Sequence, residues 1–193
     1  MQTRQKITLY DIVVVALMAA IVFSVTMFLS IRVPTPTGTT MIKLANAFCL
    51  LAGILLGGWR GGLAAGLGSM FFDLMTPEYI PEAWLTFLRF FLMGFLSGAI
   101  ARAGGADGRR HGRNLAACIV AATASTVFYF GQNIVIYMLA GSAFAPALAA
   151  QLPKLAASAV NLVIAVVVAM MLAPVLRRAL DSTRFYERLN RKD

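Results

Sequence analysis

The sequence predicts an all-α integral membrane protein, a compact bundle of six transmembrane helices with both termini in the cytoplasm. Hydrophobic residues make up 60% of the 193-residue chain, charged residues only 13%, and the mean hydropathy is +0.78. Soluble domains average about 25% charged residues. Because one crossing needs about 20 apolar residues, the chain has room for about five to seven crossings and little else, which predicts a single membrane domain.

Apolar runs place the individual helices. The first uncharged run extends from Ile12 to Ile31 and is long enough to cross a bilayer. The long run from Asn114 to Pro153 contains Gly141 and Pro146, which indicate a turn before the last helix. The expected helices cover roughly residues 9–31, 42–58, 61–76, 83–102, 114–140 and 152–176, followed by a cytoplasmic tail over residues 177–193.

Basic residues indicate the orientation, because cytoplasmic loops collect Lys and Arg. With both termini inside, the outer half keeps only Arg32, Lys43, Arg89 and Lys154 of the 17 basic residues. The net charge of +9 is therefore mainly a topology signal. We do not expect nucleic-acid binding, since the basic clusters lie in short loops and a tail beside apolar helices.

Glycines and cysteines indicate packing rather than chemistry. Gly58, Gly62 and Gly66 recur at four-residue spacing, as do Gly94 and Gly98, and such small residues allow close helix contact. Both cysteines fall within expected helices, where small buried hydrophobes are the expected role: Cys49 and Cys118.

The sequence gives little support for an enzymatic function. The only histidine, His111, lies in a basic inner loop without further ligands, so we expect neither a metal nor a cofactor. No G-x-x-x-x-G-K-[ST] pattern occurs, so ATP used in transport would be hydrolysed by partner subunits.

Polar side chains gather in the outer halves of the expected helices. Glu82, Thr86 and Arg89 are spaced by four and three residues and therefore share one helix face. An ionised side chain in the bilayer centre costs about 2.5–3.5 kcal/mol, so such groups face a cavity or pair with one another. Further polar residues occur at similar depth: Lys43, Asn46, Ser69, Asp73, Thr126, Tyr129, Gln132, Asn133, Tyr137, Lys154, Ser158 and Asn161.

These groups predict a pocket that opens outward. Tyrosines and Trp84 add flat aromatic surface to the hydrogen-bonding groups, a mixture that suits a small heterocycle bearing hydroxyl or amino groups. The segment from Arg32 to Met41 contains two prolines and Gly38, and is expected to form an extended outer loop without regular backbone pairing. The expected substrate-binding residues are Lys43, Asn46, Asp73, Trp84, Thr86, Arg89, Tyr129, Gln132, Asn133, Tyr137, Lys154, Ser158 and Asn161.

Other interpretations stay open for these residues. Lys43 could extend its ammonium group to water at the membrane edge, and Arg89 could pair with Asp73. A small multi-pass intramembrane enzyme would need a nucleophile with a nearby base, which the sequence does not supply on one side of the membrane. A structural subunit of a larger membrane complex would explain the small-residue faces but leave the outer polar cluster without a role.

The segments "ALMAA", "PTGTTMIKLANAFCLLAGILLGGWRGGLAAGLGSMFFDLM" and "YIPEAWLTFLRFFLMGFLSG" resemble the S components of energy-coupling factor (ECF) transporters. The similarity is greatest to the group for vitamins and their pyrimidine or pyridine precursors. It implies vitamin uptake across a prokaryotic plasma membrane, with the loop at Thr37, Gly38 and Thr39 as a lid. It also implies that a membrane T component docks at Ala16 and Ala20, and that two cytoplasmic ATPase subunits drive transport.

Overall fold

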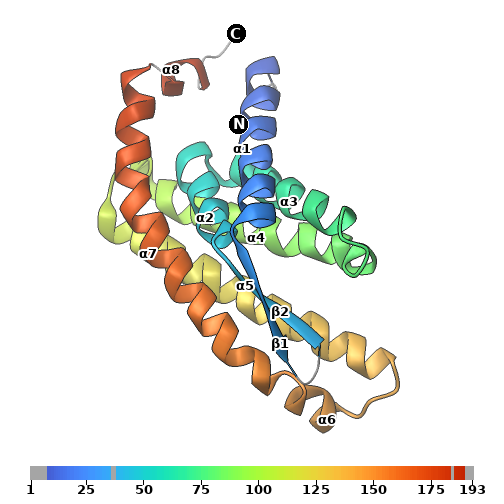
Figure 1. Cartoon of the computed structure of the whole chain (residues 1–193). Helices are drawn as coiled ribbons and strands as arrows, with labels where there is room; N and C mark the ends of the chain where they lie inside the picture. Colours follow the sequence, from blue (N-terminus) through green and yellow to red (C-terminus); the bar gives the residue numbers. More distant parts are fainter. Residues whose placement is uncertain (1–7, 36–37, 184, 190–193) are drawn as a thin grey trace, which may run out of the picture.

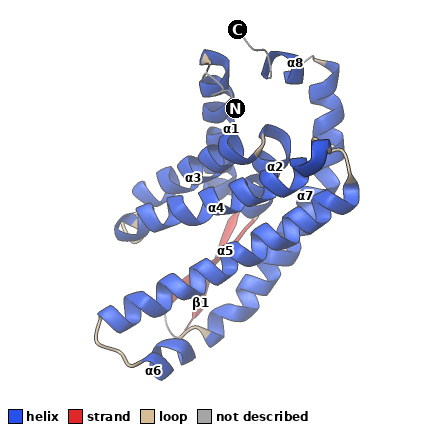
Figure 2. Cartoon of the chain, turned by 180° about the vertical axis from the view of Figure 1, so that it is seen from behind, coloured by secondary structure: helices blue, strands red, loops and turns tan. Residues whose placement is uncertain are grey.

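A computed structural model describes residues 8–35, 38–183 and 185–189 of the chain (Figure 1). Its helices and strands lie, in order, at α1 (Leu9–Phe28), β1 (Ser30–Thr35), β2 (Gly38–Lys43), α2 (Ala45–Leu56), α3 (Gly58–Leu74), η1 (Ile80–Glu82), α4 (Ala83–Arg102), η2 (Ala103–Gly105), α5 (His111–Leu139), α6 (Phe144–Ala149), α7 (Leu152–Ser182) and α8 (Phe185–Leu189). Seen from behind, α5 and α7 run alongside each other and α6 joins them at one end (Figure 2).

Within the described residues, four helical segments are long and apolar enough to cross a membrane: Leu9–Phe28, Ile80–Gly105, His111–Leu139 and Leu152–Ser182. The apolar helix α2 has only 12 residues, which span about 18 Å at the rise of an α-helix, less than the hydrocarbon core of about 30 Å. Helix α3 has 17 residues. The helical membrane protein is therefore supported, while the six crossings and the inner location of both termini remain predictions.

The segment from Arg32 to Met41 is not an irregular loop, and this expectation was wrong. Strands β1 and β2 form an antiparallel hairpin in which Arg32 pairs with Met41 and Pro34 with Thr39. The strands are rich in β-branched residues, which favour extended backbone, and each strand of a two-stranded sheet has a free edge that tolerates proline. Thr37 lies outside the described residues, whereas the backbones of Gly38 and Thr39 belong to β2.

Several helix bounds also differ from the expected ranges. The hairpin takes the last residues assigned to the first helix and the first residues assigned to the second. The expected turn after residue 140 contains the short helix α6. The expected tail is partly helical, because α7 continues to Ser182 and α8 follows. Arg177, assigned to that tail, is buried in α7.

Glycines bring α2, α3 and α4 into close contact, which confirms the packing expected from their spacing. A Cβ atom on Gly61 would lie 2.4 Å from the Cα of Gly53, and one on Gly98 would lie 2.5 Å from the backbone of Gly58. Along the contact between α3 and α4, Gly58, Gly62 and Gly66 face Phe95, Phe91 and Phe87. Cys49 and Cys118 are buried and free, as expected for small core residues.

Enlarging one of these glycines should destabilise the fold. A Cβ on Gly94 would meet the carbonyl oxygen of Gly61 at 2.6 Å, and backbone atoms cannot move aside cheaply. We expect Gly94→Val to lower the free energy of unfolding by about 1–3 kcal/mol, the usual cost of overpacking. The matched control is Gly131→Val, because no atom of the described residues lies within 4 Å of a Cβ there. Equal thermal unfolding temperatures of the two variants in detergent would contradict this packing.

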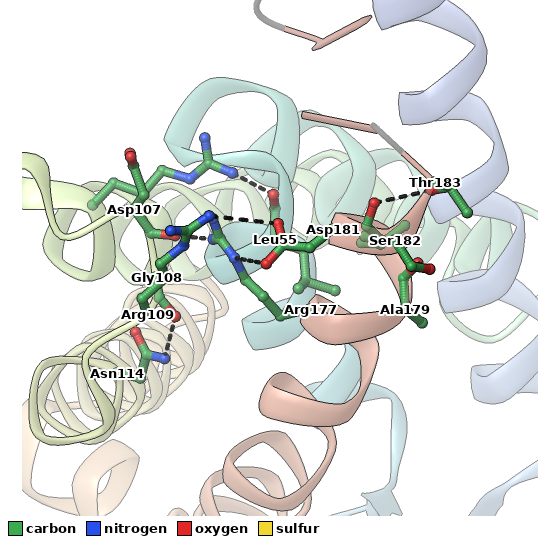
Figure 3. A network of polar contacts seen from close by, with 12 residues as sticks. Leu55, Asp107, Gly108, Arg109, Asn114, Arg177, Ala179, Asp181, Ser182 and Thr183 are labelled. Atoms are coloured by element: carbon green, nitrogen blue, oxygen red, sulfur yellow. Dashed lines mark hydrogen bonds and ion pairs between the residues drawn. The ribbon is translucent and has the colours of Figure 1, made fainter. Parts of the chain in front are cut away.

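Arginine side chains connect several helices at one end of the bundle. Arg60 of α3 forms an ion pair with Asp11 of α1 at 2.9 Å and donates to the carbonyl oxygen of Leu189 in α8 at 3.2 Å. Arg177 of α7 donates to the carbonyl oxygen of Asp107 between α4 and α5 (Figure 3). Asn114 of α5 donates to the carbonyl oxygen of Gly108 at 2.7 Å in the same turn. This end of the bundle is therefore cross-linked by side-chain to backbone bonds.

Candidate functional site

A cavity of about 460 Å³ lies among β2, α2, α3, α4, α5 and α7. Its floor includes apolar side chains such as Met93, Leu162 and Ala165. Polar residues from all six elements form most of the remaining wall. The volume lies within the range of about 300–1,000 Å³ that is typical of small-molecule sites.

The structure brings all but one of the expected substrate-binding residues to this cavity. The residues at the cavity wall are Lys43, Asn46, Asp73, Thr86, Arg89, Tyr129, Gln132, Asn133, Tyr137, Lys154, Ser158 and Asn161. Trp84 is not among the lining residues, and its side chain is 61% exposed. We therefore leave Trp84 out of the site.

Arg89 of α4 belongs to the polar wall of the cavity. Its guanidinium carbon is 4.9 Å from the centroid of the Tyr129 ring and 4.3 Å from that of Phe90. Its buried Nε atom has no hydrogen-bond partner among the described residues. A cation held against aromatic rings gains some stabilisation, but a buried donor without an acceptor is costly. The Nε–H group of Arg89 is therefore suited to donate a hydrogen bond to an acceptor atom of a bound molecule.

Asp73 does not neutralise Arg89 by direct contact. Within the described part of the chain, no ion pair joins the two residues. Lys43, a second cation of this wall, has its Nζ atom 5.1 Å from the centroid of the Phe72 ring. The cavity wall contains three basic and three acidic side chains, so its formal charges balance: Lys43, Arg89 and Lys154 against Asp73, Glu78 and Glu82.

Several lining residues carry polar atoms that are buried without a protein partner. Among the described residues, none bonds to the side-chain oxygens of Asn46 and Gln132 or to the hydroxyl of Tyr79. Burial raises the pKa of the Tyr79 phenol, and the Glu78 carboxylate adds to this effect. Tyr79 is therefore protonated at neutral pH and can donate a hydrogen bond.

Two asparagines of the wall already have protein partners. Asn133 donates to the carbonyl oxygen of Tyr129, one helical turn earlier, at 2.8 Å. The side-chain amide of Asn161 forms two hydrogen bonds with the backbone of β2, one through its oxygen and one through its nitrogen. Each keeps some hydrogen-bonding capacity, because an amide offers two donor hydrogens and two acceptor lone pairs.

Sequence reasoning missed some lining residues. Met93 lies one turn after Arg89 on the same face of α4, so helical spacing could have identified it. Ile136 also lines the cavity, but an apolar residue of a membrane helix can face either a cavity or lipid, so its position could not be predicted from its type. Met41 lies on a strand that was not expected, so its alternation with Lys43 could not be used.

The two alanines expected at a partner interface are exposed on α1. Another face of α1 packs inside the protein, because a Cβ on Gly68 of α3 would contact Ala19 and Val22. Ala16 and Ala20 therefore do not belong to the internal packing of the described residues.

A polar cavity lined in part by apolar helices that are long enough to cross a membrane is typical of a membrane protein that takes up a small polar molecule. The family model of the ECF-type riboflavin transporter S component matches residues 6–178, about nine-tenths of the chain. The chain therefore belongs to the S components of ECF transporters, as the sequence resemblance indicated. Among curated proteins, none matches it significantly.

Proposed function

We propose that this protein captures riboflavin, or a closely related flavin, in the cavity of about 460 Å³ for ATP-driven uptake. Riboflavin combines a planar tricyclic ring, which has a pyrimidinedione edge, with a hydroxylated ribityl chain. One observation supports the proposal most: aromatic rings lie beside polar groups that have no partner among the described residues. The main example is Arg89, whose guanidinium lies over the Tyr129 ring and whose Nε has no hydrogen-bond partner there. The sequence predicted a heteroaromatic vitamin or precursor, for example of the pyrimidine or pyridine type, and the riboflavin-type family model supports a flavin as the specific choice.

The charge balance of the wall supports a neutral ligand. Three basic and three acidic side chains leave no net formal charge to compensate an anion. An uncharged flavin therefore needs no counter-charge when it leaves water, whereas a phosphorylated flavin would bring uncompensated charge into a partly desolvated site.

Direct titration tests this function. Purified protein in mild detergent is titrated into riboflavin, and the quenching of flavin fluorescence is followed. We expect saturable binding of one riboflavin per chain, weaker binding of the phosphorylated flavin FMN, and no competition by thiamine or pantothenate. Saturable binding of thiamine or pantothenate without any response to riboflavin would assign a different vitamin to the cavity.

Transport requires partners, and we place their contact on α1. A membrane T component would pack against Ala16 and Ala20, whose small side chains permit a close helix approach. Two cytoplasmic ATPase subunits would supply the energy. The basic residues of the α4–α5 turn and of the end of α7 support a prokaryotic plasma membrane topology with this end in the cytoplasm.

The β1–β2 hairpin is the proposed lid. Met41 and Lys43 of β2 belong to the cavity wall, so any displacement of the hairpin changes the wall itself. The lid would then move as a paired unit rather than as a flexible loop.

A further inference from the structure

One side chain of α7 holds the free edge of the hairpin. The Oδ1 atom of Asn161 accepts a hydrogen bond from the backbone N–H of Lys43 at 2.7 Å. Its Nδ2 atom donates to the carbonyl oxygen of Met41, also at 2.7 Å. The two bonds fix the orientation of the amide, because a flipped amide would place like groups together.

The geometry is that of a strand partner. Backbone groups of residues two apart in a strand point to the same edge. The N–H of Lys43 and the carbonyl of Met41 therefore share one edge of β2, the edge away from β1. The Asn161 amide supplies one donor and one acceptor to this edge, as the peptide groups of a third strand would.

This contact sets the position of a cavity wall. Side chains of residues two apart also lie on the same face of a strand, and both Met41 and Lys43 line the cavity. Movement of β2 along α7 would displace both side chains together. We propose that Asn161 is a positioning residue, which fixes the register of the hairpin on α7 and thereby shapes the site that receives the ligand.

This inference rests on the proposed function only for its effect on affinity. The positioning itself is a property of the ligand-free protein and can be measured without any ligand. A role for Asn161 as a direct ligand contact alone predicts an unchanged hairpin position in the absence of ligand, so the two roles can be separated.

Distances between spin labels provide the ligand-free measurement. Labels are placed at Ile31→Cys on β1 and Val163→Cys on α7, which are 66% and 57% exposed, while the two native cysteines are buried. We expect a narrow distance distribution in this labelled parent. Asn161→Leu should broaden it, because a leucine bonds neither backbone group. Ser158→Ala is the matched control, since Ser158 also lines the cavity from α7 but makes no hydrogen bond to β2 among the described residues.

A pH-dependent rescue makes the test specific to the hydrogen bonds. In Asn161→Asp, the ionised carboxylate accepts from Lys43 but cannot donate to the Met41 carbonyl. The protonated acid can do both. The distribution of this variant should therefore be broad at about pH 8 and narrow at about pH 3, because only a pH below the usual Asp pKa of about 3.9 protonates most of the carboxyl.

Other charged groups around the cavity also respond to pH, so the parent and Asn161→Leu are measured at both values. These groups are Lys43, Asp73, Glu78, Glu82, Arg89 and Lys154. The parent should stay narrow and Asn161→Leu broad at both. Riboflavin affinity should fall about tenfold or more in Asn161→Leu, in line with two lost hydrogen bonds.

Two results would overturn the proposal. One is a narrow ligand-free distribution in Asn161→Leu, whatever happens to riboflavin affinity. The other is an Asn161→Asp distribution that is the same at both pH values. If no variant binds riboflavin, including the parent, while the distributions behave as expected, the assignment of riboflavin fails and the positioning role of Asn161 stands.

Discussion

Replacing Ala16 and Ala20 by tryptophan is expected to abolish energised riboflavin uptake while riboflavin binding to the isolated protein is retained. Both alanines are exposed on α1, and residues four apart share a helix face. Two indole side chains would fill the shallow groove that a partner helix needs for close backbone approach. The cavity lining contains no residue of α1, so the substitutions leave the site itself unchanged.

The matched control places tryptophans on another exposed face. Ala116 and Val120 also lie four residues apart, both are exposed, and they share one face of α5. Uptake should survive in Ala116→Trp/Val120→Trp. Uptake in cells, riboflavin affinity of the purified protein and co-purification with the T component are measured for both pairs. Normal uptake by the α1 double variant would remove α1 as the docking surface, and loss of its riboflavin binding would show that the alanines support the fold.

Arg89→Leu is expected to weaken riboflavin binding by about tenfold to a hundredfold. Hydrogen bonds to a charged group contribute about 1.5–3 kcal/mol, and each 1.4 kcal/mol corresponds to a factor of ten in affinity. Arg89→Lys should recover only part of the loss, because an ammonium group lacks the planar fork that stacks on Tyr129 and bonds two acceptors.

The ligand-free stability distinguishes a binding role from a structural one. The Nε atom of Arg89 is buried without a partner within the described chain, so its removal relieves a desolvation cost. We therefore expect the unfolding temperature of ligand-free Arg89→Leu to equal or exceed that of the parent. Arg178→Leu, at an exposed position of α7 outside the cavity lining, is the control and should change neither the riboflavin affinity nor the unfolding temperature. A marked loss of ligand-free stability in Arg89→Leu would instead assign Arg89 a structural role.

The polar residues of α4 and α7 could be predicted to share a cavity because their signal is local. Spacings of three and four place Thr86 with Arg89, and Lys154 with Ser158, on single helix faces, and the cost of burying polar groups in lipid turns those faces inward. Trp84 was misplaced because aromatic character alone does not indicate which helix face a residue occupies. Its side chain is mostly exposed.

The hairpin and the C-terminal helix could not be predicted from local patterns. The contact between β2 and α7, through Asn161 and the Met41 carbonyl, joins residues about 120 positions apart in the chain. Pro34 suggested an irregular loop, yet it lies in a strand of a two-stranded sheet and pairs with Thr39. Arg177 was assigned to a cytoplasmic tail because the last uncharged run ends at Leu176. In the structure Arg177 instead lies within α7, which continues to Ser182, and it contacts the Asp107 carbonyl and the Tyr186 ring.

The central claim is that this S component holds a flavin in the cavity walled by Arg89 and Tyr129. The most direct measurement is native mass spectrometry of the protein purified in mild detergent from cells grown in rich medium, with the released small molecule identified by its mass. We expect one bound molecule per chain with the mass of riboflavin or a close relative, and a strongly reduced amount in Arg89→Leu. Protein that carries only lipid, and that gains no small ligand after incubation with riboflavin, would contradict the claim.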